Sequence, residues 1–201
     1  GIVAGFADAS GGFLPLVATL NASRPIDAVR QLLGLSWEQF SSVVQSAAPG
    51  SGGLTLLPFF DGERMPNLPD ATGLLGGISR LSLTPENMAR AAVEAVVSNL
   101  SHGLEAIVKQ TEKLNRLMLI GGGAQNLGVQ QVVSQSVSLP VLVPEPGEYV
   151  AFGAAKQAAW ALSGKRPGWE PRSRALPMGD THSVARDQFD DLLGKYLQNF
   201  N

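Results

Sequence analysis

The chain lacks several features that mark whole classes of protein. It has no cysteine among its 201 residues, which excludes disulfide bonds and thiolate metal sites and makes a reducing cytoplasm the simplest compartment. No apolar run approaches the roughly 18–20 residues that a membrane-spanning helix requires. The formal net charge of −2 provides no electrostatic footprint for nucleic acid or for an anionic membrane surface.

What is present describes a globular chain with a sizeable core. Hydrophobic residues make up 44% of the sequence and charged residues 16%, and the length suits one large domain or one lobe of something larger. The sequence opens at Gly1, without Met, directly in strand-like residues. We therefore expect a fragment cut from a longer polypeptide.

The first half of the sequence predicts a β-hairpin followed by two short helices. Turn-forming residues separate two apolar runs, and polar residues precede the helical patterns. The residues expected to cap the two helices are Asn21 and Ser23 for the first and Ser36 for the second. The expected elements are strands over 1–7 and 13–20, helices over 25–33 and 37–47, a strand over 54–60 and an irregular segment over 61–80.

The second half alternates between helical and strand patterns. A strong helix start at Thr84-Pro85-Glu86 combines an N-cap, a proline at the first helical position and an acid in the first turn. The expected elements are helices over 85–113, 127–136 and 150–162, strands over 116–120 and 141–143, a surface segment over 164–180 and a closing helix over 187–200. Antiparallel strands followed by parallel ones predict an α/β fold of the ribonuclease-H-like (actin/hexokinase-type ATPase) class, a mixed sheet flanked by helices.

The run from Leu117 to Asn126 joins an apolar strand, three consecutive glycines and the start of a helix. Glycine lets a ligand approach the backbone, and the start of a helix offers unpaired N–H groups, so such a junction suits a nucleotide. It has neither the G-x-G-x-x-G spacing of a dinucleotide site nor the ending of a P-loop. Taken alone, the run is equally typical of a turn that needs glycine only for packing.

Several separated segments together resemble one family. The resemblance is to the carboxy-terminal domain of FGGY carbohydrate kinases, most closely that of the xylulokinases, and it runs from near residue 1 to about residue 165. The segments that carry it are Gly62-Glu-Arg-Met-Pro66, Gly73-Leu-Leu-Gly-Gly-Ile78, Asn87-Met88 with Ala91-Ala-Val-Glu94, Gly121-Gly-Gly-Ala-Gln-Asn126 and Phe152-Gly-Ala-Ala155.

The resemblance implies a two-lobed sugar kinase with ATP and sugar bound in the cleft between the lobes. Residues 1–201 would form the carboxy-terminal, nucleotide-binding lobe, with 164–201 as a surface segment and closing helix. The general-base aspartate and the hairpin that grips the phosphates would belong to the absent amino-terminal lobe, so no catalytic residue and no metal ligand is expected in this chain.

The implied reaction is the ATP-dependent phosphorylation of D-xylulose to D-xylulose 5-phosphate, with ATP and Mg²⁺ as cofactors. The implied partners are ATP and the sugar, with no nucleic acid and no membrane, and a homodimer remains open. Other substrates of the family (glycerol, gluconate or rhamnulose) are alternatives. A nucleotide-binding module that performs no chemistry is a further alternative.

The resemblance also assigns the nucleotide contacts. Its adenosine motif covers Gly121, Gly122, Gly123, Ala124 and Asn126: the glycine backbone would lie against adenine and ribose, and the Asn126 side chain would bond the base.

Ser23 and Asp27 would line the other side of the adenine pocket. Alternatively, Ser23 is only a helix cap and Asp27 an acid that compensates the helix dipole in the first turn.

The remaining polar and aromatic candidates favour structural roles. Glu63 and Arg64 are expected to pair with each other or with neighbouring helices and so to hold a cleft-side loop rigid, with direct substrate contact as the alternative. Neither His102 nor His182 has a serine or carboxylate motif beside it that would suggest hydrolase chemistry. Trp160, between alanines, is expected to fill the core.

Overall fold

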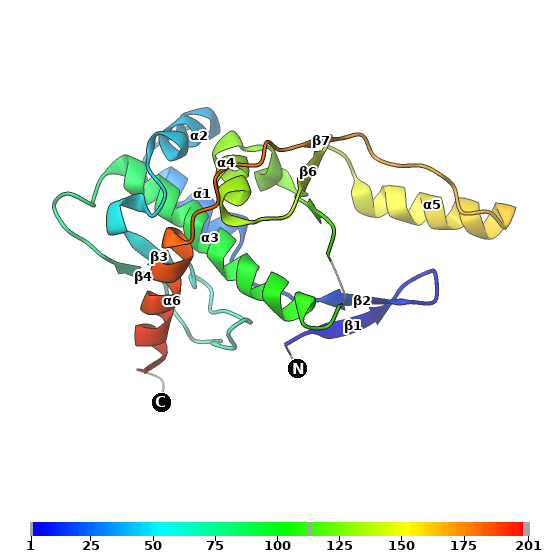
Figure 1. The fold of residues 1–201 in the computed structure, drawn as a ribbon, viewed down its shortest axis with the longest axis horizontal. Coiled ribbons are helices and arrows are strands. Elements are labelled where there is room, and N and C mark those ends of the chain that lie inside the picture. The colour runs from blue at the N-terminus through cyan, green and yellow to red at the C-terminus, as the bar shows by residue number, and fades with distance from the viewer. Residues whose placement is uncertain (1, 112–113, 199–201) are drawn as a thin grey trace.

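The computed structural model describes residues 2–111 and 114–198, which form helices packed around one central helix together with three small sheets (Figure 1). The helices are α1 (Ser23–Leu32), α2 (Trp37–Ser46), α3 (Pro85–Val108), α4 (Leu127–Ser136), α5 (Tyr149–Ser163) and α6 (Val184–Leu197), with 3₁₀ turns η1 (Ser51–Gly53) and η2 (Gly122–Gln125). The strands are β1 (Ala4–Ala7), β2 (Phe13–Leu16), β3 (Thr55–Leu57), β4 (Leu74–Gly76), β5 (Leu117–Met118), β6 (Val141–Pro144) and β7 (Ser173–Ala175).

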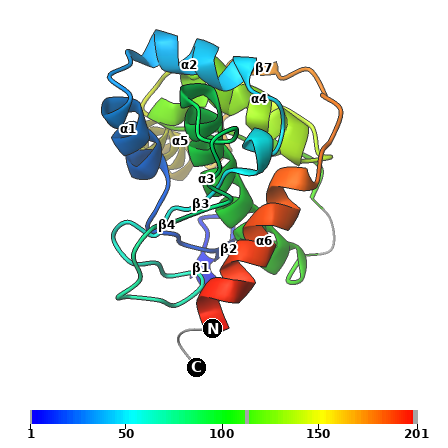
Figure 2. The ribbon, with the colours of Figure 1, turned by 90° about the vertical axis from the view of Figure 1, so that its left-hand side faces the viewer.

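Helix α3 is the centre of the fold. Thr84 caps it by accepting a hydrogen bond from the backbone N–H of Asn87 at 3.2 Å, and Pro85 occupies the first turn, as the sequence predicts. Every residue from Ala89 to Asn99 is buried, because α1, α2, α4 and α6 pack against α3 from different sides (Figure 2). The expected extension of this helix to residue 113 stops at Val108, and residues 112–113 lie outside the described residues.

The sheets contain the antiparallel and parallel pairings that the sequence order predicts. Strands β1 and β2 form an antiparallel hairpin with Ala4 opposite Leu16, and β5 lies parallel to β6. Two three-residue strands fall in segments expected to be irregular: β4 pairs with β3, and β7 pairs with β6. Strand β3 ends at Leu57, directly before Pro58, because proline has no N–H to donate to a ladder.

Two helix starts differ in their capping. Ser36 caps α2 as expected, in a capping box with Gln39. Helix α1 instead begins at Ser23 itself, and neither Ser23 nor Asn21 caps it. Buried Asn21 is drawn away by tertiary partners, accepting from the N–H of Phe60 at 3.1 Å and donating to the Gly62 carbonyl at 2.6 Å. The expectation of a side-chain cap here is wrong because a long-range contact competes with the local one.

Helix α5 extends away from the other helices and buries none of its residues (Figure 1). Its apolar side chains are instead exposed: Val150 is 90% accessible and Leu162 is 92% accessible. Trp160 is only partly covered, with the Arg166 guanidinium 5.9 Å from its ring centroid. The expectation that Trp160 fills the core is therefore wrong: the described contacts of α5 include the segment that follows it, for example Phe152 with Trp169, but they bury none of its residues. No helix of the described residues is long and apolar enough to cross a membrane.

Candidate nucleotide-binding site

The glycine turn connects β5 to α4 with its backbone facing open space. Gly121 has φ of +98°, a conformation that side-chain-bearing residues rarely adopt, and η2 follows it directly. A Cβ at Gly121, Gly122 or Gly123 would meet no atom within 4 Å. Packing against the rest of the described chain therefore does not require glycine at these three positions. The arrangement instead leaves an uncovered stretch of backbone at the entry to a helix, which suits an anionic or planar ligand.

Ala124 lies inside the turn, and Asn126 joins the turn to α4. Ala124 is buried, and its carbonyl accepts a hydrogen bond from the Gln130 side chain at 2.6 Å. Asn126 caps α4: its Oδ1 accepts from the Val129 N–H at 3.1 Å, while its Nδ2 donates to the Trp37 carbonyl at 3.3 Å. Because an amide nitrogen carries two hydrogens, one N–H of this half-buried side chain remains to donate to a ligand.

Asp27, predicted to line the adenine pocket, contacts side chains of its own helix α1. This residue lies beyond the first turn of α1 and does not compensate the helix dipole there. Its carboxylate instead accepts from Arg30 Nε at 2.9 Å and from Gln31 Nε2 at 2.8 Å. Ser23 is exposed at the start of the same helix.

A second polar cluster surrounds Glu63, whose carboxylate is buried with only 1% of the residue accessible. It accepts from the Leu20 N–H at 2.8 Å and from the side-chain amides of Asn21 and Asn99, each at 3.0 Å. The N–H of Arg64 also donates to it at 2.7 Å, but the Arg64 side chain is exposed and forms no ion pair within the described residues. Glu63 thus joins the start of α1, its own loop and α3, and the expected pairing of the two side chains with each other is not found.

A buried ion pair on α3 was missed at the sequence level. Arg90 and Glu94 lie 2.7 Å apart on successive turns, both nearly inaccessible. Arg90 also donates to the Ala47 carbonyl at 3.0 Å and to Gln135 Oε1 at 2.7 Å, so it ties the end of α2 to the end of α4. The sequence pattern that predicts this pair is an opposite charge four residues along an otherwise apolar stretch of helix.

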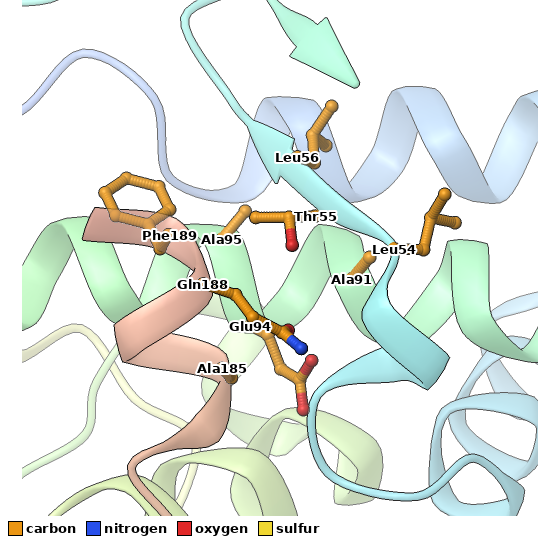
Figure 3. Close-up of a pocket in the computed structure, with 9 residues that line it drawn as sticks. All are labelled: Leu54, Thr55, Leu56, Ala91, Glu94, Ala95, Ala185, Gln188 and Phe189. Atoms are coloured by element: carbon orange, nitrogen blue, oxygen red, sulfur yellow. The ribbon is translucent and has the colours of Figure 1, made fainter. Parts of the chain in front are cut away.

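Glu94 completes this network by accepting from the Gly50 N–H at 3.0 Å and the Ser51 hydroxyl at 2.7 Å. It also lines a small cavity between β3, α3 and α6 (Figure 3). With a volume of about 10 Å³, this cavity holds about one water molecule at most. It is a gap in the packing and cannot accept a nucleotide.

A larger open groove of about 870 Å³ lies between the β1–β2 hairpin and the end of α3. Its walls include Phe13, Met65, Glu105 and Leu193, and no residue of the glycine turn reaches it. The described residues contain no cluster of three or more His, Cys, Asp or Glu side chains that could hold a metal ion. Neither cavity includes a residue of the glycine turn, which is kept as the candidate nucleotide site because its backbone is uncovered.

The chain is similar in sequence to known carbohydrate kinases. The pattern of the FGGY family of carbohydrate kinases, C-terminal domain, matches residues 15–162. A xylulose kinase of Streptomyces rubiginosus is 42% identical over 190 residues, which cover 94% of this chain and 38% of that protein. A xylulose kinase of Streptomyces coelicolor is 44% identical over 166 residues, covering 82% and 33% respectively.

Solved structures show the same likeness. The crystal structure of xylulose kinase from Bifidobacterium adolescentis superimposes with a TM-score of 0.85 at 38% identity, covering 96% of this chain and 39% of that one. The fold is therefore of the α/β, ribonuclease-H-like class that the sequence predicts. The chain belongs to the FGGY family of carbohydrate kinases and matches its C-terminal domain. It spans only about two fifths of the length of these relatives.

Proposed function

We propose that the protein carrying this chain is an ATP-dependent xylulokinase that converts D-xylulose to D-xylulose 5-phosphate. The observation that carries the proposal is identity of 42% and 44% to two xylulose kinases, the first over 94% of the chain. A glycerol kinase and a gluconokinase match less, at 34% and 32% over 135 residues each. ATP and the sugar would be the partners of the site, and the cytoplasm, which supplies both, its location.

In this proposal the chain supplies the adenosine-binding lobe. The backbone of Gly121, Gly122 and Gly123 would lie against adenine and ribose, with Ala124 as the buried support of the turn. The remaining amide hydrogen of Asn126 would donate to a base nitrogen. The open space around the three glycines supports this assignment, as does the position of the turn at the start of a helix.

Ser23 and Asp27 are proposed to belong to the opposite wall of the pocket, on α1. The exposed hydroxyl of Ser23 can contact a ligand directly. Asp27 would not contact the ligand itself but would position Arg30, because its carboxylate already accepts from Arg30 and Gln31. Glu63 would keep the start of α1 in place through its bonds to Leu20 and Asn21.

We further propose that residues 1–201 form one lobe of a two-lobed enzyme, and that the other lobe carries the general base. Phosphoryl transfer to a hydroxyl needs a group that accepts its proton and groups that neutralise the phosphates. Mg²⁺ would accompany the ATP phosphates, but the acidic side chains described here do not form a site for it, and we assign it no ligand in this chain. Exposed apolar side chains on β2 and α5, Phe13 and Leu162 among them, support burial against further protein.

Coupled ADP release by the full-length protein tests the proposal, with xylulose, glycerol, gluconate and rhamnulose offered separately. We expect the highest kcat/KM with xylulose. A preference for glycerol would overturn the xylulose assignment and leave the kinase class intact. ATP binding without turnover of any of the four sugars would instead support the alternative of a nucleotide-binding module.

A further inference from the structure

Trp37, the first residue of α2, is an exposed aromatic side chain held in one orientation. It is 44% accessible, although a tryptophan offers one of the largest gains from burial. Its ring system forms a T-shaped pair with Phe40, with centroids 6.0 Å apart and planes at 81°. The guanidinium of Arg30 lies over the indole, 4.9 Å from the centroid, within the range of a cation–π interaction.

Arg30 is itself fixed by three contacts to two partners, Asp27 and the Leu35 carbonyl. Asp27 accepts from its Nε at 2.9 Å and forms an ion pair with its Nη2 at 2.8 Å. The third contact is from Nη1 to the Leu35 carbonyl at 2.6 Å. Asp27, Arg30 and Trp37 therefore form a connected series from α1 to α2, and the indole is preorganised before any ligand arrives.

The main chain of Trp37 lies beside Asn126 of the glycine turn because α2 and α4 are joined near their starts. Asn126 donates to the Trp37 carbonyl at 3.3 Å, and the Gly128 N–H donates to the Ser41 hydroxyl at 2.9 Å. A Cβ at Gly128 would come within 2.9 Å of the Val44 side chain, so the two helices approach closely here. An exposed aromatic residue is thus bonded through its carbonyl to Asn126, at the end of the turn whose glycine backbone is uncovered.

We infer that Trp37 is a base-binding residue of the nucleotide site: its exposed indole is the stacking surface for the base. Arg30 lies over the indole, and Asp27 positions Arg30. This inference rests on the proposed adenosine-binding function and adds to it an aromatic residue that contacts the base. Every base has a π-face, and stacking on an aromatic side chain is worth enough to change affinity by about tenfold or more.

The test uses the full-length protein that carries this chain and compares Trp37→Ala with Trp37→Phe. Removing the ring should raise the KM for ATP by about tenfold or more and leave kcat and the sugar KM near the wild-type values. The phenylalanine variant keeps a ring and should recover most of the ATP affinity. Glu38→Ala, an exposed neighbour on the same turn, is the matched control and should change neither constant.

A fluorescence measurement keeps the inference falsifiable if Trp37→Ala folds poorly. With excitation selective for tryptophan, ATP should quench the wild-type emission, Trp37→Phe should lose most of that quench, and Trp169→Phe, which removes another exposed tryptophan, should retain it. An undiminished quench in Trp37→Phe, or unchanged ATP KM in folded Trp37→Ala, would overturn the inference. Failure of the wild-type protein to bind ATP would instead overturn the proposed function.

Discussion

Asn126 shows how one side chain at the candidate site serves both the fold and the ligand. Its oxygen caps α4 and its nitrogen reaches the Trp37 carbonyl, so truncation removes structural bonds as well as any contact to the base. Asn126→Ala in the full-length protein should weaken ATP binding by about 1–2 kcal/mol and cost about 1 kcal/mol of stability through the lost cap. Steady-state kinetics with ATP and a thermal melt measure the two effects.

The substitution Asn126→Asp keeps the N-cap but removes both donations of the side chain, to the Trp37 carbonyl and to the ligand. Aspartate is as good an N-cap as asparagine, but when ionised it has no hydrogen to donate. We expect a melting temperature nearer to wild type than that of the alanine variant, together with weakened ATP binding. An ATP KM that does not move in either variant would show that Asn126 does not contact the base.

The three glycines should respond differently to substitution because only Gly121 has a positive φ among them. Gly123→Val adds a side chain where no atom lies within 4 Å, so the protein should fold and melt nearly as wild type. A ligand that approaches this backbone would be blocked, and ATP binding should suffer more than in Asn126→Ala. Normal ATP affinity in folded Gly123→Val would refute a close approach of the nucleotide.

Gly121→Val serves as the contrasting variant. Its φ of +98° is combined with ψ of 174°, a region that is almost restricted to glycine. The strain of a valine there should cost about 1–3 kcal/mol. A lowered melting temperature for Gly121→Val and an unchanged one for Gly123→Val would separate conformational need from ligand access.

At the scale of elements, Glu63 joins three segments that are distant in sequence. Glu63→Ala would leave the Leu20 N–H and the amides of Asn21 and Asn99 without their acceptor in a buried setting. Each unsatisfied buried donor costs about 1–3 kcal/mol, so the variant should lose several kcal/mol in chemical denaturation. Arg64→Ala, which removes an exposed side chain, should stay within about 0.5 kcal/mol of wild type. Equal stability of the two variants would contradict the joining role of Glu63.

Sequence reasoning succeeded where an element is specified by its own residues. Ser36 and Thr84 cap their helices as predicted, since the bonds concerned span only three residues. It failed where contacts between distant residues determine a side chain's position. Asn21 bonds Glu63 and does not cap α1, and Trp160 lies on a helix with no buried residue. The short strands β4 and β7 exist through their pairing partners, which no local pattern reveals.

The candidate site divides in the same way. The glycine turn and Asn126 were visible from the sequence because a strand, three glycines and a helix follow one another directly. Trp37 and Arg30 were not visible as parts of it, because α1, α2 and α4 meet only through tertiary contacts. The family resemblance predicts that Asp27 lines the pocket, whereas the bond between its carboxylate and Arg30 is seen only in the structure.

At the scale of the whole molecule, apolar surface is distributed unevenly. The helices around α3 share a core of buried apolar side chains. The β1–β2 hairpin and α5 extend away from these helices (Figure 1), and their apolar side chains are exposed. Neither β1 nor β5 has a second neighbouring strand among the described residues. Such edges pair readily with other chains, and exposed apolar patches usually mark surfaces that another part of a protein covers. We therefore propose that the other lobe of the protein covers the β1–β2 hairpin and α5.

This placement predicts that the 201-residue chain, purified alone, shows no sugar kinase activity. The general base would lie in the other lobe, and its help is typically worth about 10²–10⁴-fold in rate. Positioning of the two substrates in a closed cleft would be lost as well, which contributes several orders of magnitude more. Adenine nucleotide binding should survive weakly, because the glycine turn, Asn126 and Trp37 all belong to this chain. A direct binding measurement should therefore detect ATP, while a coupled assay detects no xylulose-dependent ADP release by the isolated chain and does detect turnover by the full-length protein. Saturable xylulose-dependent ADP production by the isolated chain, proportional to its concentration, would overturn the division of labour between the lobes.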